Sequence, residues 1–593
     1  MAKLSETYPK WYSAKRGINH SKHPSIELPT HTYLDVVSFI FSHQHTGISA
    51  LIDSSSGYSL SYAELFPLVK SMASALQSRG ISQGDVVLLL LPNSIYYPII
   101  FLAVLYLGAI VTAMNPLSSV SEIKKQVTDC NVHLAFTVHQ NVENLKALGI
   151  SIITVPENLD IDSKQVQFSD FYELVSGNFD LVTKPVIRQQ DTAAILYSSG
   201  TTGASKGAVL THRNFIAVVE LFVKFEASQY EYLSSENVYL AVLPMFHIYG
   251  LSLFVLGLLS LGSSIVVMKK FETNEMVRMI ERYRVTHLPV VPPILMALTK
   301  GAKGMRGDSL KSLKQVSSGA APLNRKIIEN FVQAFPHVDL IQGYGMTEST
   351  AVGTRGFNTK DYCKYSSIGL LAPNTQAKVI NWDNGSCLPP GHSGELWLRG
   401  PAIMKEYMNN AEATMSSIDS DGWLHTGDIV YFDQDGYLYI VDRIKEIIKY
   451  KGFQISPADL EAVLICHPEI VDVAVTAQYK AMLLPSGINK MVGGFLAADW
   501  MGKACPLTVN GAMDEESGEI PVAFVVRRHG SSLTQDAVID YLAQQVIHSE
   551  LTDFHAVAPY KKVKKVVFTH SIPKSAAGKI LRRELRKLLS SRL

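Results

Sequence analysis

The stretch Tyr197 to His212 reads YSSGTTGASKGAVLTH, a dense run of small and hydroxylated residues around a single lysine. Its glycines let the backbone approach a bulky ligand, its hydroxyls can donate hydrogen bonds, and Lys206 supplies one mobile positive charge. A polyphosphate requires these groups. The preceding segment, Thr192 to Tyr197, predicts a short strand, and Arg213 to Leu221 predicts the start of a helix. We therefore expect a phosphate-binding loop between a strand and a helix.

The loop follows neither of the two common nucleotide-binding patterns. It fits no G-x-x-x-x-G-K-[ST] and no G-x-G-x-x-G. The alternative is a flexible Ser/Gly/Thr linker, but a linker has no need of an apolar strand before it or of a lysine within it.

Composition limits the classes of partner. The chain has 593 residues, which predicts two or more domains, and its 54 Lys and Arg nearly balance its 53 Asp and Glu. This balance gives no electrostatic footprint for nucleic acid or an anionic membrane, so we expect small-molecule partners. The five cysteines include no C-x-x-C pair, which favours a reducing compartment without disulfides or a zinc site.

Targeting signals are few. The N-terminus shows no signal-peptide pattern, and the ending Ser591-Arg592-Leu593 is close to the S-K-L peroxisomal address. Two charge-free stretches, Ile99 to Met114 and Ile248 to Met268, approach membrane length. The second is interrupted by glycine and serine, so it predicts a buried helix, a turn and a buried strand, and we expect no stable membrane span.

The first third alternates strand and helix patterns. Apolar runs predict strands at Asp85 to Leu91, Ala109 to Ala113 and His133 to Val138, with helices at Tyr97 to Leu107 and Ser121 to Asp129. This alternation predicts parallel sheets covered on both faces.

Two later segments are candidates for a substrate pocket. His247, in Leu243 to Tyr249 (LPMFHIY), is either a satisfied core histidine or part of a pocket wall. Gln315 to Leu323, QVSSGAAPL, predicts a strand that breaks into small residues, and a flat ligand can lie against bare backbone there.

A second dense motif, QGYGMTEST, covers Gln342 to Thr350. Tyr344 can stack on a planar base, while Thr347 and Glu348 place a hydroxyl beside a carboxylate, as a phosphate and its Mg²⁺ require. A glycine-rich turn is the alternative. Downstream, WLHTGDI predicts Asp428 on a tight turn, where its carboxylate either grips the hydroxyls of a ribose or simply faces the solvent.

The last part predicts a hinge and a smaller domain. Val441 to Glu461 carries a basic run and then Ser456-Pro457, which starts a helix in the N-cap manner. Helix, strand, strand, helix and strand patterns follow, closed by IPKSAAGKI and a basic helix. Lys579 stands at the tip of that loop, either as a residue that swings into another domain or as an ordinary surface lysine.

All these motifs occur in the same order in the adenylate-forming superfamily, and the chain resembles that superfamily from about Tyr33 onward. LPMFHIY, QGYGMTE, VDRIKEIIKYKGFQISPADLE and IPKSAAGKILRREL are most similar to plant 4-coumarate–CoA ligases, enzymes of phenylpropanoid metabolism, and to 4-coumarate–CoA ligase-like enzymes. The SRL terminus is similar to peroxisomal members of the second group. The resemblance implies an α/β fold: a large N-terminal domain of stacked αβ sheets with helices, residues 1–441, and a small mobile α+β C-terminal domain, residues 442–593.

The resemblance also implies residue roles, with Asp442 marking the hinge. The ligands of ATP or AMP are Ser198, Ser199, Gly200, Thr201, Thr202, Lys206, Gln342, Gly343, Tyr344, Thr347, Asp428, Arg443 and Lys579. The acyl substrate is bordered by His247, Tyr249, Ala320 and Gly345. The groups assigned to CoA are Lys270, Lys449, Lys451 and Gly452. The catalytic set is Lys579, Lys206, Glu348 and His247, and Glu348 would also place Mg²⁺.

The implied activity is an ATP-dependent carboxylate–CoA ligase in the peroxisome, or alternatively in the cytoplasm, acting on a hydroxycinnamate-like aromatic acid or on a fatty or oxylipin acid. A peroxisomal import receptor would read Ser591-Arg592-Leu593. Other readings are a binder of ATP or acyl-adenylate impaired in thioester formation, and a luciferase-type monooxygenase that shares the adenylation motifs.

Two segments depart from the family pattern. Residues 478–511 and 547–557 are interposed in the small domain and have no assignable periodicity. A long apolar loop is unusual in a compact domain. We therefore interpret them as translated intron remnants or products of alternative splicing rather than functional additions.

Overall fold

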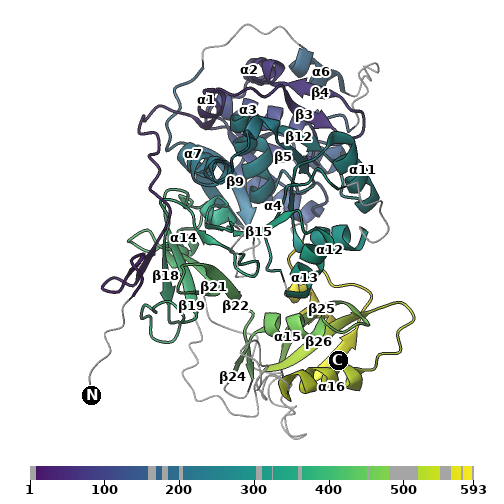
Figure 1. Cartoon of the computed structure of the whole chain (residues 1–593). Coiled ribbons are helices and arrows are strands. Elements are labelled where there is room, and N and C mark those ends of the chain that lie inside the picture. Colours follow the sequence, from purple (N-terminus) through teal and green to yellow (C-terminus); the bar gives the residue numbers. More distant parts are fainter. Residues whose placement is uncertain are drawn as a thin grey trace, which may run out of the picture. The chain divides into compact units, whose positions relative to one another are not determined.

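The computed structural model describes residues 8–157, 168–176, 184–198, 205–301, 310–323, 325–357, 363–450, 453–479, 519–547, 563–575 and 578–590. The chain divides into two compact units. The first is Met1–Ile440 with Ala576–Lys579, and the second is Val441–Ser575 with Ile580–Leu593. Most of the first unit is coloured purple to teal in Figure 1.

A seven-stranded sheet of the first unit has the order β20-β10-β9-β6-β5-β7-β8. Every residue of the interior strand β5, Val86–Leu90, is buried, as expected for a parallel strand covered on both faces. Strands β5 to β9 pair in parallel, whereas β9, β10 and β20 pair antiparallel. The other strands are β6 (Ile110–Ala113), β7 (Val132–Thr137), β8 (Ser151–Thr154), β9 (Thr192–Ser198), β10 (Lys206–Thr211) and β20 (Glu406–Tyr407).

A nine-stranded sheet has the order β17-β16-β15-β14-β13-β11-β12-β3-β4. Its centre is parallel, and antiparallel pairs close both edges. Its strands are β3 (Ser49–Asp53), β4 (Ser59–Ser61), β11 (Val238–Ala241), β12 (Ser264–Val267), β13 (His287–Val290), β14 (Gln315–Ser318), β15 (Asp339–Tyr344), β16 (Thr354–Arg355) and β17 (Leu370–Leu371).

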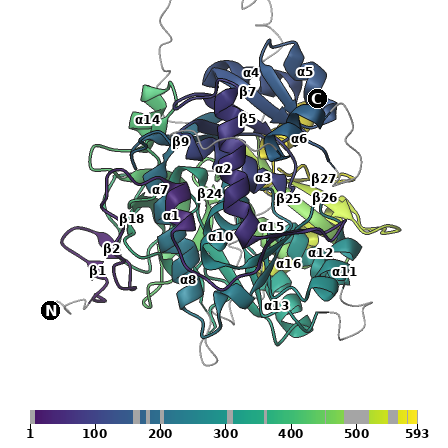
Figure 2. The same cartoon turned by 90° about the horizontal axis from the view of Figure 1, so that it is seen from above.

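Helices connect and cover these strands. Helix α3, Tyr96–Tyr106, is apolar all round and buried, and it contacts α2 (Tyr62–Ser78), strand β6 and the π-helical segment η5 (Leu251–Gly257). Figure 2 shows α2 beside α3. A capping box at Ser61 and Glu64 fixes the start of α2.

The remaining helices of the first unit lie between strands along the chain. They are α1 (Val36–Phe41), α4 (Val120–Cys130), η1 (His139–Asn141), α5 (Val142–Lys146), α6 (Ser169–Ser176), α7 (His212–Val218), η3 (Val219–Lys224), α8 (Phe225–Ser228), η4 (Ser234–Glu236), α9 (Ile248–Gly250), α10 (Leu258–Leu261), α11 (Thr273–Tyr283), α12 (Pro292–Gly301), α13 (Arg325–Ala334), η7 (Thr347–Ser349) and α14 (Ala411–Ser417).

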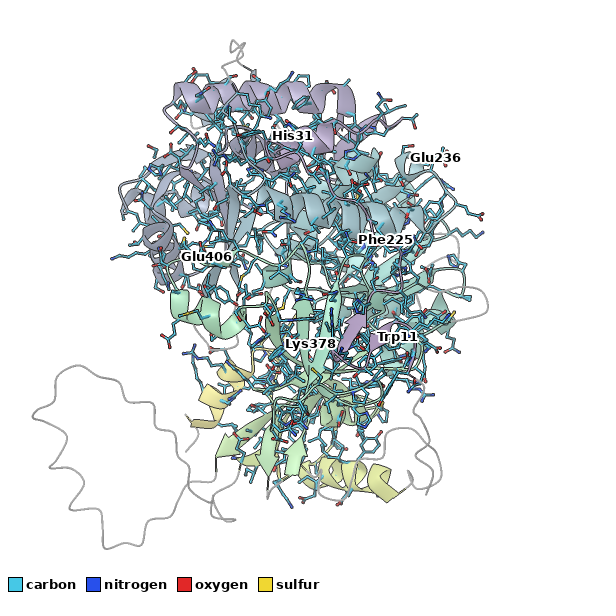
Figure 3. The ribbon with its side chains drawn as sticks, turned by 90° about the vertical axis from the view of Figure 1, so that its left-hand side faces the viewer. Trp11, His31, Phe225, Glu236, Lys378 and Glu406 are labelled. Atoms are coloured by element: carbon cyan, nitrogen blue, oxygen red, sulfur yellow. The ribbon has the colours of Figure 1, made fainter. Side chains whose placement is uncertain are left out.

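A third, six-stranded sheet has the order β1-β2-β18-β19-β21-β22. Strand β19, Gly394–Arg399, alternates buried and partly exposed residues, so one face builds its own small core. Lys378, on β18, and Trp11, just before β1, lie at this sheet in Figure 3. The other strands are β1 (Tyr12–Ser13), β2 (Ile18–His20), β18 (Gln376–Ile380), β21 (Leu424–Phe432) and β22 (Leu438–Arg443).

The second unit is built on the three-stranded sheet β25-β26-β27. Alternate residues of β25 and β26 enter two separate apolar clusters, one shared with α15 and α16 and the other with α17. Both faces of the sheet are therefore covered. The elements are β23 (Ile448–Tyr450), β24 (Phe453–Ile455), α15 (Pro457–Leu464), β25 (Ile470–Tyr479), β26 (Glu519–Arg527), α16 (Gln535–Ile547), β27 (Lys565–Phe568) and α17 (Arg582–Ser590).

The fold class and the parallel order of the first strands are confirmed. The apolar stretch after His247 forms helix, turn and strand as predicted, with Gly262 at φ +73° in the turn. In the described part of the chain, no helix is both long and apolar enough to cross a membrane. The interposed segments 478–511 and 547–557 lie outside the described residues except for Gln478, Tyr479 and Ile547, which belong to regular elements.

Candidate active site

The predicted phosphate loop joins two strands, and the prediction of a strand-to-helix loop is wrong. Strand β9 ends at Ser198 and β10 begins at Lys206, and these two residues are partners in an antiparallel ladder. The apolar run Ala208 to Leu210 is buried, which extends the sheet by one strand before helix α7 begins. The ligand candidates Ser199, Gly200, Thr201 and Thr202 lie outside the described residues.

A buried carboxylate lies next to this hairpin. Glu348, in η7, is 4% exposed, and its Oε1 accepts hydrogen bonds from the Ser198 hydroxyl at 2.7 Å and from the Tyr407 hydroxyl at 2.7 Å. The ammonium of Lys206 lies 4.9 Å from the centre of the Tyr407 ring. Burial and the adjacent Glu348 raise the pKa of Tyr407, so it remains a hydrogen-bond donor. Distant segments thus bring a carboxylate, hydroxyls and a cation together.

A second polar pair joins the nine-stranded sheet to the third sheet. Tyr344, the last residue of β15, donates a hydrogen bond of 2.6 Å to Oδ2 of Asp428, which is 4% exposed. The prediction that Asp428 occupies a tight turn is wrong, because it lies inside strand β21. Gly427, at φ +71°, precedes it where the pairing of β19 with β21 shifts register. The bulge sets the direction of the carboxylate without ending the strand.

Further residues of the QGYGMTEST motif are fixed in place by contacts within the protein. The Gln342 amide donates to the carbonyl of Tyr365 at 2.7 Å, and its oxygen accepts from the Leu323 amide at 3.1 Å. Thr347 begins η7 and is buried. A methyl group on Gly345 would lie 2.3 Å from the carbonyl oxygen of Ala351, so only glycine fits there.

Three of the four candidates for the acyl pocket lie at helix α9 or just after strand β14. His247 caps α9 through Nδ1, which accepts from the Tyr249 amide at 3.3 Å. Burial lowers the pKa of His247 to about 4, so its imidazole is neutral. The Tyr249 ring packs against Gly319, followed by Ala320 at φ +67°. As predicted, strand β14 is therefore followed by small residues, which lie beside the aromatic ring of Tyr249.

The remaining candidates belong to other parts of the chain. Lys270 is exposed after β12, and Gly343 lies within β15. In the second unit, Arg443 ends β22 and Lys449 lies in β23, while Lys451 and Gly452 fall outside the described residues. Lys579 directly precedes Ile580, which pairs with Lys574 in an isolated antiparallel β-bridge.

Asp442, the predicted hinge residue, is 6% exposed. Its Oδ2 accepts from the Ser456 hydroxyl at 2.5 Å and from the Ala458 amide at 3.1 Å, at the first turn of α15. Ser456 is the N-cap of that helix, as predicted.

A magnesium ion fits the chemistry of the Glu348 cluster. Carboxylate and hydroxyl oxygens are its preferred ligands, and it is commonly held by few protein groups together with substrate phosphates. In the described ranges no group of three or more His, Cys, Asp or Glu side chains is placed to hold a metal.

Family models match most of the chain. The AMP-binding enzyme model matches residues 41–408, and the AMP-binding enzyme C-terminal domain model matches residues 505–579. The chain belongs to the AMP-binding, adenylate-forming enzyme family. It is 59% identical to 4-coumarate--CoA ligase-like 6 of Arabidopsis thaliana over 584 residues, 98% of this chain and 95% of the relative. It is 42% identical to Peroxisomal OPC-8:0-CoA ligase 1 of the same plant, with 96% of each chain covered.

Solved structures share the fold of this acid–CoA ligase family member. ATP-bound MatB from Rhodopseudomonas palustris superimposes with a TM-score of 0.78 at 24% identity, covering 94% of this chain and 99% of that one. The anthranilate CoA ligase AuaEII in complex with anthranoyl-AMP gives 0.76 at 20% identity, covering 95% and 99%.

Sequence reasoning missed three residues of the first unit. Tyr407 lies in a two-residue strand without a chemical motif, yet it donates to Glu348. Glu226 and Arg355 form a buried ion pair next to Tyr249, although they are separated by 129 positions. No local sequence pattern could reveal these contacts, because each joins residues that are far apart in the chain.

Proposed function

We propose that the protein is an ATP-dependent carboxylate–CoA ligase. It would activate an aromatic hydroxycinnamate-like acid, or a fatty or oxylipin acid, as acyl-AMP with release of pyrophosphate, and then form the acyl-CoA thioester with release of AMP. The observation that carries the proposal is the Glu348 cluster, with Ser198, Lys206 and Tyr407, in a chain of the adenylate-forming family.

The first step follows from charge. The substrate carboxylate attacks the α-phosphorus of ATP, a bond to the pyrophosphate oxygen breaks, and negative charge builds on the phosphorus oxygens. Both reactants are anions, so positive groups must offset their repulsion. We assign that role to Lys206 and Lys579, with Mg²⁺ placed by Glu348 supplying further positive charge.

Nucleotide contacts are proposed for the second polar pair and its neighbours. Asp428, held by Tyr344, would accept hydrogen bonds from the ribose hydroxyls, and Thr347 would contact the α-phosphate. Because the Gln342 amide is bonded on both sides within the protein, we assign it to shaping the adenine site rather than to contacting the base. Arg443 would touch the nucleotide.

The acyl and CoA assignments rest on the resemblance to the adenylate-forming enzymes. Neutral His247, Tyr249, Ala320 and Gly345 would border the reacting end of the acid. Lys270, Lys449, Lys451 and Gly452 would serve the thioester step, in which the CoA thiol attacks the acyl carbonyl and AMP leaves. Asp442 would act as the hinge between the two steps.

Mass spectrometry of the purified chain tests the proposal. The chain is incubated with ATP, Mg²⁺, CoA and a panel of hydroxycinnamic, benzoic, fatty and oxylipin acids, and acyl-AMP and acyl-CoA are scored separately. A thioester on one acid supports the ligase. Adenylate without thioester would instead favour a protein impaired in its second step, and no acyl product would reject the proposal.

We also propose a peroxisomal location through Ser591-Arg592-Leu593, supported by the peroxisomal relative. A fluorescent protein fused ahead of the full chain should collect in peroxisomes, and removal of the last three residues should leave it in the cytoplasm. Cytoplasmic fluorescence from both fusions would contradict this location.

A further inference from the structure

The loop that carries Lys579 is closed at its base by backbone contacts. Lys574 and Ile580 form an isolated antiparallel bridge, and the Leu581 amide donates to the Pro573 carbonyl at 2.9 Å. Lys579 directly precedes the bridge residue Ile580. The chain on either side of the bridge, here called the two legs of the loop, belongs to the second unit. The position of Lys579 therefore depends on how these two legs are held.

The first leg is held by an ion pair. The Lys574 ammonium lies 2.7 Å from Oδ2 of Asp472, which belongs to β25. The other carboxylate oxygen, Oδ1, accepts a hydrogen bond from the Val473 amide at 3.0 Å. The side chains of Lys574 and Asp472 are 26% and 29% exposed, and an ion pair this exposed adds little to stability. Its main effect is to attach the first leg to a strand that is itself paired with β26.

The second leg is held by Arg582, the first residue of α17. Its side chain is only 9% exposed. The guanidinium pairs with Glu446 and donates to Oε1 of Glu461 at 2.6 Å and to the Val475 carbonyl at 2.9 Å. These bonds join the start of α17 to α15 and β25, which lie side by side in Figure 1. Because a guanidinium holds its donors in a rigid plane, they fix the direction of the second leg.

Arg582 also connects the loop to the chain that follows the proposed hinge. Glu446 lies four positions after Asp442 in the sequence. Burial raises the pKa of Asp442, and the nearby charge of Arg582 acts in the opposite sense. The segment that starts at Asp442 and the second leg of the loop therefore share one network of charges.

Stability alone does not explain these two anchors. A buried ion pair such as Arg582 with Glu461 seldom stabilises a fold more than apolar residues of the same size would. Both anchors, however, attach the chain within five positions of Lys579. Displacement of a catalytic group by about 1 Å can lower a rate by about 100-fold. The anchors should therefore affect the rate of a step that uses Lys579 more than they affect folding.

We propose that Lys574 and Arg582 are positioning residues that hold Lys579 for adenylate formation, each through its ion pair at the base of the loop. Neither residue is assigned a contact with ATP or with the acid. The inference rests on the proposed ligase function, in which Lys579 serves the first step. The thioester step, assigned to other lysines, does not depend on the two anchors.

The exposed anchor gives the first test, because its variants should fold. In D472N and K574M, the single-turnover rate of acyl-AMP formation should fall by roughly tenfold. Thioester formation from supplied acyl-AMP and CoA should stay within about twofold of the wild type. The exchanged pair D472K/K574E should recover adenylate formation to within about threefold. Equal losses in the two half-reactions, or no loss in either, would overturn the proposal.

A double-mutant cycle tests whether Asp472 acts through Lys579. Removal of Lys579 in K579A should make the anchor irrelevant, so D472N/K579A should form acyl-AMP within about twofold of the rate of K579A. A merely structural role of Asp472 predicts the same roughly tenfold loss in both backgrounds. That result would contradict positioning.

The buried anchor is tested with R582K, which keeps the charge near Glu446 and Glu461 but loses the planar fork. Adenylate formation should fall more than thioester formation from supplied acyl-AMP. The matched control E584Q/K587M removes an exposed ion pair of α17, the same helix, and should leave both half-reactions unchanged. A loss in the control equal to that in R582K would show that α17 is sensitive to any substitution.

Hydrogen exchange tests the anchors without turnover. The Leu581 amide, which donates to Pro573 at the base of the loop, should exchange roughly tenfold faster in D472N and return to the wild-type rate in D472K/K574E. Unchanged exchange in D472N would overturn the inference even in an inactive chain. A wild type that forms no acyl-AMP would instead reject the ligase function, so the two failures are distinguishable.

Discussion

At the scale of residues, Glu348 is the group whose charge and hydrogen bonds can be separated experimentally. Glu348→Gln keeps an amide oxygen that can accept from Ser198 and Tyr407, but it removes the negative charge proposed to place Mg²⁺. We expect adenylate formation to fall by roughly 100-fold or more, with little change in thermal stability. Pyrophosphate release and the melting temperature measure the two effects.

Tyr407→Phe is the matched control, because it removes one hydrogen bond to the same oxygen and leaves the charge. Its loss of adenylate formation should be smaller, about tenfold. If Glu348→Gln and Tyr407→Phe were equally impaired, the hydrogen bond rather than the charge would be the important property of Glu348.

At the scale of elements, two π-helical segments approach each other more closely than side chains normally allow. An added methyl group at Gly257, the last residue of η5, would lie 2.3 Å from Val223 of η3. Gly257→Ala should destabilise the fold by about 1–3 kcal/mol through overpacking. Denaturant unfolding measures the change.

Combining Gly257→Ala with Val223→Ala should recover only part of that stability, because Val223→Ala removes the two overlapping γ-methyl groups but keeps the Cβ, which lies 2.5 Å from the added methyl group. Val223→Ala alone serves as the control for the lost apolar contacts. Strict additivity of the two losses would show that the segments do not meet as described.

The elements also show what could be predicted from the sequence. Strands such as β5 and β9 are short continuous apolar runs, and their length and composition predict a buried strand. The strand at Lys206 was missed because its first residues are polar and glycine-rich, and only pairing with β9 shows it. The bulge that directs Asp428 depends on register with a strand that lies about 30 residues earlier in the chain.

At the scale of the whole molecule, the two units should respond to pH in opposite directions. In the first unit, burial lowers the pKa of His212 and His247 to about 4 and that of His287 to about 3. Below about pH 6.5 the unfolded chain binds protons that the folded unit does not, so stability falls on acidification.

In the second unit, burial raises the pKa of Glu461 to about 7, although Arg582 beside it acts in the opposite sense. The folded unit then holds a proton that the unfolded chain loses above about pH 4.5, so this contribution to stability is lost as the pH rises through 7. Hydrogen exchange of peptides from each unit between pH 5 and pH 8, corrected for intrinsic rates, measures both trends.

Glu461→Gln should flatten the pH dependence of the second unit and leave that of the first unchanged. The variant retains an oxygen that can accept from Arg582 and from the Val475 amide. Parallel trends in the two units of the wild type would contradict the expected protonation states.

The interposed segment between β25 and β26 gives a further prediction. The two strands stay paired as far as Tyr479 and Glu519, so their ladder does not depend on what connects them. Replacing residues 482–513 by a short turn should preserve acyl-CoA formation and the melting temperature. Loss of activity on deletion, together with transcripts that always encode the segment, would show that it is a functional addition.

The two-sided core of the second unit has a consequence for how such ligases diversify. Strands β25 to β27 bury apolar residues on both faces against helices of their own unit. The second unit therefore has its own hydrophobic core. Substitutions at the proposed acyl pocket beside Tyr249 then leave the residues of these two apolar clusters unchanged. Substrate choice and the second unit can evolve as separate modules.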